Sequence, residues 1–226
     1  MNISSINYHS PEFKHFGEAE QNGQPYSKKQ KLIIAGMSAV GTAASCAILA
    51  KRAGYSLNPS KIFNLKNIKN SYLAKVKYHD EQVIPIGVGS ILGGLAGGYM
   101  VDKDPNARKE KRREALMQVG NVSIPILTVD FLSEKLGKYG KVAKTCGAVA
   151  GIFAGVYLAN IIMNRVNNFI FNKKEGRDMK LTDFSAHVDD AVVAASYVSS
   201  SPIVDKIERI IPIVLMIPGN EVGNKK

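Results

Sequence analysis

Three long runs without a charged residue constrain this chain more than any other feature. Residues 32–49 form a run of eighteen, and residues 83–101 and 145–163 form runs of nineteen. A helix needs about 20 mostly apolar residues to cross the hydrocarbon core of a bilayer. Lysine or arginine flanks each run, where the side chains can reach the lipid head groups. The runs therefore predict membrane-spanning helices.

The alternative is that the runs are buried helices of a soluble bundle. A soluble core helix usually keeps a polar face at the helical spacing, and these runs lack one apart from small Ser and Thr residues. The overall composition of 45% hydrophobic and 22% charged residues is ordinary only because polar segments lie between the runs. We expect an all-α, multi-pass integral membrane bundle.

Two further segments are apolar but contain proline, which breaks or kinks a helix. Residues 115–132 include Gln118, Asn121, Pro125 and Asp130, and residues 191–204 include Pro202. We expect broken or re-entrant helices near the two prolines, since such backbone is tolerated at membrane depth when it is buried in protein. The candidate spans are 32–50, 83–101, 115–132, 143–163 and 188–204.

Small residues recur every four positions along all three runs. Residues at i and i+4 share a helix face, so each stripe leaves a groove where a neighbouring backbone can come close. In water, each interior glycine weakens a helix by about 1 kcal/mol relative to alanine, so a soluble helix rarely carries so many. The candidate packing residues are Ala35, Ala39 and Ala43, then Gly89, Gly93 and Gly97, then Gly147, Gly151 and Gly155.

The two glycine stripes resemble the glycine-zipper segments of small membrane proteins, which are a packing motif without a common activity. They can serve oligomerisation or a pore, but three stripes in one chain can also satisfy one another, which is the interpretation we favour. Residues 89–99 also align without gaps on residues 147–157. This match is compatible with a duplicated unit or with small-residue composition alone.

The polar segments predict surface structure on both sides of a helical membrane domain at 32–218. Residues 1–31 lack the apolar region of a cleavable signal peptide and predict a disordered tail. Residues 60–79 alternate apolar and lysine residues at the helical spacing, which predicts an amphipathic basic helix on an anionic membrane surface. Residues 219–226 are predicted to form a polar C-terminal tail.

The charge balance of 30 Lys and Arg against 19 Asp and Glu favours anionic partners. Anionic lipid head groups are the expected partner, with a homo-oligomer as a further possibility. Nucleic acid is not expected, because the basic cluster at 108–113 lacks neighbouring aromatic residues for base stacking. Five spans would place fifteen Lys and Arg on each side of the membrane, so the positive-inside rule gives no orientation.

Few residues suggest chemistry. Asp130 is the one carboxylate well inside an apolar segment of the middle region, and an ionisable residue at membrane depth is a candidate for a polar pathway. His79 and His187 lie beside carboxylates, but the spacing matches no metal motif. Cys46 and Cys146 lie in uncharged runs and are interpreted as packing residues. We expect no cofactor and no metal, and no enzyme motif is evident.

These observations predict a non-catalytic multi-pass membrane protein that acts as a structural or assembly component through close glycine-mediated helix packing. One alternative is a small transporter or channel with broken helices near Pro125 and Pro202. Another is a peripheral helical protein that binds anionic surfaces.

Overall fold

The computed structural model describes residues 25–54, 80–172, 176–187, 191 and 211–226. Within these ranges the regular structure is helical and no strand occurs. The elements are α1 (Lys28–Arg52), α4 (Asp80–Val101), α5 (Pro105–Gly137), α6 (Lys141–Phe171), the 3₁₀ helix η2 (Leu181–His187), α9 (Ile211–Val214) and α10 (Met216–Asn224).

Four of these helices, α1, α4, α5 and α6, are long and apolar enough to cross a membrane. They overlap the first four candidate spans, including the proline-containing segment at 115–132. The fifth candidate span, at 188–204, lies almost entirely outside the described residues. The predicted amphipathic helix at 60–79 and residues 1–24 of the predicted tail also lie outside them.

Local capping sets where α1 and α5 begin. The Ser27 hydroxyl accepts a hydrogen bond from the Gln30 N–H, and the Gln30 side chain accepts one from the Ser27 N–H, which forms a capping box. Asp104 caps α5, and Pro105 occupies its first turn, where a missing N–H costs nothing. Residues 28–31 were expected in the disordered tail but form the first turn of α1, because the capping box precedes the apolar run.

The helix α5 continues through Pro125 and does not break there. The prediction of a broken helix at this proline is therefore wrong for the described structure. Local hydrogen bonds support the helix: the Thr128 hydroxyl lies 3.1 Å from the Ile124 carbonyl oxygen and 2.8 Å from the Gly151 carbonyl oxygen of α6. Pro202 lies outside the described residues.

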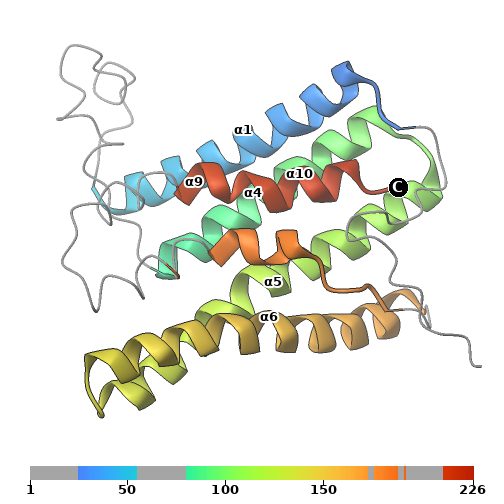
Figure 1. The fold of residues 1–226 in the computed structure, drawn as a ribbon. Helices are drawn as coiled ribbons and strands as arrows, with labels where there is room; N and C mark the ends of the chain where they lie inside the picture. The colour runs from blue at the N-terminus through green and yellow to red at the C-terminus, as the bar shows by residue number, and fades with distance from the viewer. Residues whose placement is uncertain (1–24, 55–79, 173–175, 188–190, 192–210) are drawn as a thin grey trace, which may run out of the picture.

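The helices form two groups, which are joined by contacts of α5 with α4 and α10 (Figure 1). In one group α1 runs antiparallel to α4, and α10 lies along both of them (Figure 1). In the other, α5 and α6 form a long antiparallel hairpin. The N-terminus of α1, the turn between α4 and α5, and the C-termini of α6 and α10 lie at one end, here called the α4–α5 end. The opposite end, called the hairpin end, holds the α5–α6 turn and the C-terminus of α1.

The C-terminal residues differ most from the sequence analysis. Residues 219–224 were expected in a polar tail but belong to α10, where Gly219, Val222 and Gly223 are buried. A helix of nine residues is marginal in isolation, so packing must stabilise it. Gly219 and Gly223 lie against Gly94 and Gly98 of α4 so closely that an added methyl group would meet backbone.

Candidate functional site

A row of buried polar residues runs along one face of α5 near the α4–α5 end. Glu114, Gln118 and Asn121 are spaced by four and three positions, which places them above one another on a helix. All three are buried. Two segments that are distant in the sequence, residues 177–187 and α10, supply their polar partners.

Arg177 joins α5 to the segment that leads into η2. Its guanidinium contacts both oxygens of Glu114, at 3.0 and 3.1 Å, and both oxygens of Asp183, at 2.6 and 2.9 Å. Asp183 also accepts a hydrogen bond from the Lys180 N–H at 2.8 Å. Burial alone would lower the pKa of Arg177, but hydrogen bonds to Asp183 and the charges of Glu114 and Asp183 raise it above its ordinary value. The guanidinium therefore stays charged inside the bundle.

Gln118 extends this network to the C-terminal helix. Its amide nitrogen donates to Glu114 at 3.0 Å and to Glu221 of α10 at 2.6 Å. One buried side chain thus links the carboxylates of two helices. The ion pairs and hydrogen bonds hold α10 and residues 177–183 against α5.

The innermost member of the row lies beside a proline. Because Pro125 has no N–H, the Asn121 carbonyl oxygen has no donor four residues along the helix. The Nε2 atom of the buried His187 lies 2.7 Å from this oxygen and takes that place. The Asn121 side chain is also buried, and neither its nitrogen nor its oxygen has a hydrogen-bond partner among the described residues.

A second polar group closes the α4–α5 end. The buried Lys111 ammonium lies 3.5 Å from Asp102 and donates to the Tyr26 hydroxyl and to the Lys225 carbonyl. Tyr26 in turn donates to Asp102. Burial would raise the pKa of Asp102, but hydrogen bonds from Tyr26 and the Asp104 N–H and the charge of Lys111 together lower it. Burial of Tyr26 and its hydrogen bond to the Asp102 carboxylate raise the pKa of Tyr26.

The two polar groups connect elements and hold no recognisable set of metal ligands. No group of three or more His, Cys, Asp or Glu residues within the described ranges could hold a metal ion. Each carboxylate named above faces a cation, a hydroxyl or an amide. What this arrangement does chemically is to fix charged groups inside a helical bundle and to join its segments.

The structure places the predicted glycine stripes at contacts between helices. Gly93 and Gly97 of α4 face Ile34 and Met37 of α1. Gly89 lies against Gly41 and Ser45 of the same helix, while Gly147, Gly151 and Gly155 of α6 lie against Leu132, Val129 and Pro125 of α5. At Gly93, Gly147 and Gly151 the nearest atoms belong to the backbone of the neighbouring helix.

The alanine stripe and Asp130 lie elsewhere than the sequence suggested. On α1 the buried residues are Ile34, Ser38 and Thr42, whereas Ala35 and Ala39 are half-buried and Ala43 is exposed. The contact face of α1 is thus rotated from the alanine stripe. Asp130 is exposed on the outer side of α5 with Leu127 and Phe131, away from the buried polar row.

Part of the polar row was visible in the sequence, and part was not. The spacing of Glu114, Gln118 and Asn121 alone predicts that they share one face of a helix. Nothing in the sequence connects Arg177, Asp183 or Glu221 to that face, because all three lie more than fifty positions further along the chain.

Comparison with known proteins gives no information about function, so any functional interpretation depends on the geometry described above. No family model matches the chain, and neither a curated protein nor a solved structure matches it.

Proposed function

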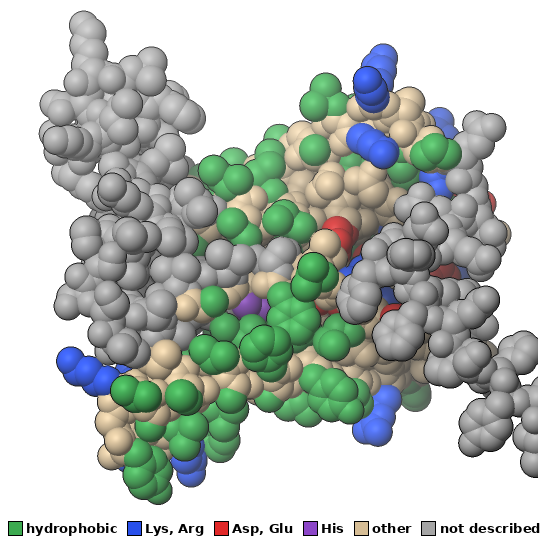
Figure 2. Space-filling view, viewed as in Figure 1, with side chains coloured by type: hydrophobic (Ala, Val, Ile, Leu, Met, Phe, Trp, Pro, Cys, Tyr) green, Lys and Arg blue, Asp and Glu red, His purple; other side chains and the backbone are tan. Residues whose placement is uncertain are grey.

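We propose that the chain is an integral membrane protein with a non-catalytic, structural role. The observation that carries this proposal is the distribution of large apolar side chains on the outer faces of the four long helices. Exposed members include Val40, Leu92, Leu127, Phe153 and Tyr157, one or more on each helix. Figure 2 shows such side chains along α6, with Lys and Arg gathered toward the ends of the molecule. In water this surface would be costly, whereas acyl chains would cover it.

The interior supports a structural role. The buried ion pairs of Arg177 with Glu114 and Asp183 hold segments together, and the glycine contacts bring backbones close within one chain. Since the described glycine stripes face helices of the same chain, assembly with a partner would use another surface. The open side of α6 is the candidate, because α6 packs mainly on α5.

Carbonate extraction tests the membrane part of the proposal. Membranes from cells that express the full chain are washed at high pH and centrifuged. We expect the protein to stay in the pellet and to enter solution only with detergent. Release into the alkaline wash would leave only a peripheral protein.

Photocrosslinking tests the structural part. A photoreactive amino acid replaces Tyr157, which is 59% exposed on α6, or its neighbour Val156, which is fully buried. An assembly component predicts one discrete protein adduct at position 157 and none at position 156. Adducts with lipid alone at position 157 would contradict assembly through this face.

Transport is a second candidate, favoured by one observation. The buried polar row ends at Asn121, whose side-chain amide has no hydrogen-bond partner among the described residues. Flux of water and glycerol into proteoliposomes, followed by light scattering, tests it. Transport predicts flux above empty vesicles that is lost on Asn121→Leu and kept on Asp130→Asn, since Asp130 faces outward. Flux equal to that of empty vesicles would contradict transport of small polar solutes.

A further inference from the structure

Acidic and basic side chains separate at the α4–α5 end. The acidic ones are engaged within the chain: Asp102 with Lys111 and Tyr26, Glu110 with Arg113, and Asp104 with the N–H groups that begin α5. Asp102 and Glu110 are half-buried, while Asp104 stays exposed, and the exposed Lys and Arg residues at this end outnumber the exposed carboxylates.

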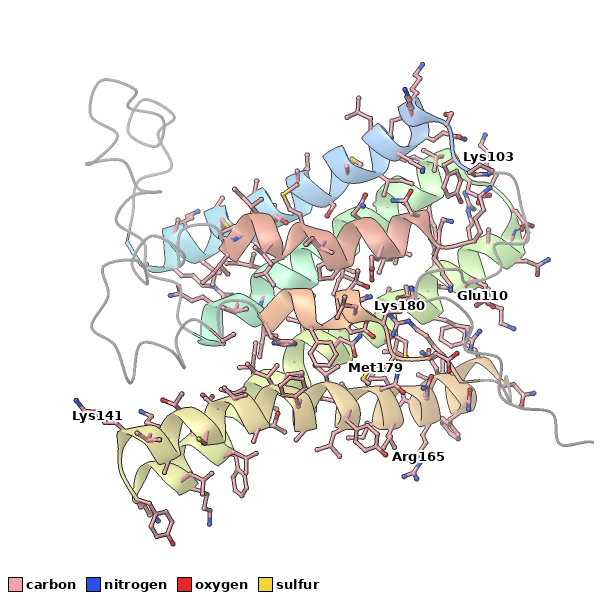
Figure 3. The ribbon with its side chains drawn as sticks, in the orientation of Figure 1. Lys103, Glu110, Lys141, Arg165, Met179 and Lys180 are labelled. Carbon is pink, nitrogen blue, oxygen red and sulfur yellow. The ribbon has the colours of Figure 1, made fainter. Side chains whose placement is uncertain are left out.

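The exposed cations at this end have no carboxylate partner among the described residues. Lys28, Lys29 and Lys31 lie on the first turn of α1, and Lys103 lies in the turn between α4 and α5. The two positions are neighbours, because the Gln30 side chain reaches the Val101 carbonyl and Tyr26 reaches Asp102. Figure 3 shows Lys103 beside the N-terminal end of α1. The two segments that carry the four lysines therefore lie side by side.

Exposed apolar side chains adjoin these cations. Leu32 follows the lysines of α1 and is 73% exposed, and Met100 precedes Lys103 and is 63% exposed. A phospholipid presents this same order of chemistry, with an anionic phosphate above acyl chains. Soluble phosphate would use the cations alone and would leave Leu32 and Met100 in water.

We propose that Lys28, Lys29, Lys31 and Lys103, together with Leu32 and Met100, form a surface that binds anionic phospholipids. This inference rests on the proposed membrane insertion. It adds that the leaflet at the α4–α5 end supplies anionic phospholipids to this surface. Each end carries two exposed carboxylates among the described residues, Asp104 and Asp178 here and Asp130 and Glu134 at the hairpin end, but the α4–α5 end has more exposed Lys and Arg. Each Lys or Arg near an anionic surface adds to the attraction, so four of them give a strong preference.

Lipid counting by native mass spectrometry tests the surface. The full chain in a neutral detergent is titrated with phosphatidylglycerol or with phosphatidylcholine, and the apparent affinity of each is measured. We expect phosphatidylglycerol to bind tighter by roughly tenfold or more. The variant Lys28→Gln/Lys29→Gln/Lys31→Gln/Lys103→Gln should remove this preference and leave phosphatidylcholine binding unchanged.

A matched variant removes four exposed cations at the other end: Lys51→Gln/Arg52→Gln/Lys138→Gln/Lys141→Gln. It should keep the preference for phosphatidylglycerol. Equal binding of the two lipids by the wild type, or equal loss in both variants, would overturn the proposal. Binding of inorganic phosphate as tight as that of phosphatidylglycerol would also overturn it, since phosphate leaves the apolar part of the surface empty.

The lipid-binding experiment and the carbonate extraction test different claims. Release of the chain in carbonate would reject the proposed function itself. A chain that stays in the membrane pellet but binds both lipids equally would reject only the anionic lipid surface.

Discussion

Pro125 and His187 form a pair in which one residue removes a hydrogen bond and the other restores it. We predict that His187→Ala lowers the free energy of unfolding by about 1–3 kcal/mol, because it leaves the buried Asn121 carbonyl without a donor. In a Pro125→Ala background the N–H of residue 125 returns to that carbonyl, so the same change should cost less. Denaturant unfolding in detergent micelles, followed by circular dichroism, measures both effects.

The control for this comparison, of His187→Ala with and without Pro125, is Pro105→Ala. Pro105 lies in the first turn of α5, where an N–H has no helical acceptor, so its replacement should not alter the cost of His187→Ala. Equal costs of His187→Ala with and without Pro125 would contradict the pairing.

Arg177 is the main cation that faces the buried carboxylates of the site. Its loss in Arg177→Gln leaves Glu114 and Asp183 buried without their main cation. Breaking a buried pair in this way typically costs about 3–5 kcal/mol. We expect a loss of that size in the unfolding free energy, measured in detergent micelles.

Arg165→Gln provides the matched control, because Arg165 points away from α6 into the surroundings (Figure 3) and is exposed. Its loss should change stability by less than about 0.5 kcal/mol. Similar losses in the two variants would show that the buried network contributes little.

At the scale of the helices, the contact between α1 and α4 depends on backbones that touch. A methyl group on Gly93 would overlap the Met37 carbonyl of α1, whereas one on Gly36 would meet no atom within 4 Å. Alanine favours a helix by about 1 kcal/mol over glycine, so Gly36→Ala should keep or raise stability. Gly93→Ala should lower it despite that gain, as measured by thermal unfolding in detergent.

The pair also tests the proposed packing directly. Because both substitutions add the same atom to a long helix, propensity alone predicts the same sign for both. A stabilising effect of Gly93→Ala would contradict a close contact between α1 and α4.

How much of these elements the sequence could predict depends on their length. The uncharged runs at 32–49, 83–101 and 145–163 lie within α1, α4 and α6, since length and the absence of charge are sufficient to predict them. The contact face of α1 was not predictable from small residues alone, because Ser38 and Thr42 serve as well as alanine at a close contact. The short α10 was missed because its helicity comes from packing on α4 rather than from local preference.

The candidate site was predictable only along α5. Glu114, Gln118 and Asn121 follow helical spacing, but Arg177 and His187 reach them through the tertiary fold. Asp130 was selected because it lies in an apolar segment, and the structure places it on the outer side of α5. Hydropathy along a chain predicts how deep in the membrane a charged residue lies, but it does not predict which side of the helix the residue occupies.

For the whole molecule, the arrangement of the long helices supplies an orientation that five spans did not. If α1, α4, α5 and α6 are the only spans, fourteen of the Lys and Arg that the structure describes fall on the side of the α4–α5 end and six on the other. The positive-inside rule then predicts that the α4–α5 end faces the cytoplasm. This is also the end that carries the proposed surface for anionic lipids.

Cysteine labelling in the membrane tests this orientation. In a Cys46→Ala/Cys146→Ala background, one cysteine is placed at Asn106, near the α4–α5 turn, or at Tyr139, in the α5–α6 turn; both residues are exposed. A membrane-impermeant maleimide added to intact cells should label Tyr139→Cys but not Asn106→Cys. Inverted vesicles should give the opposite pattern. Labelling of both positions from one side would contradict an odd number of crossings between residues 106 and 139, which α5 as a membrane span requires.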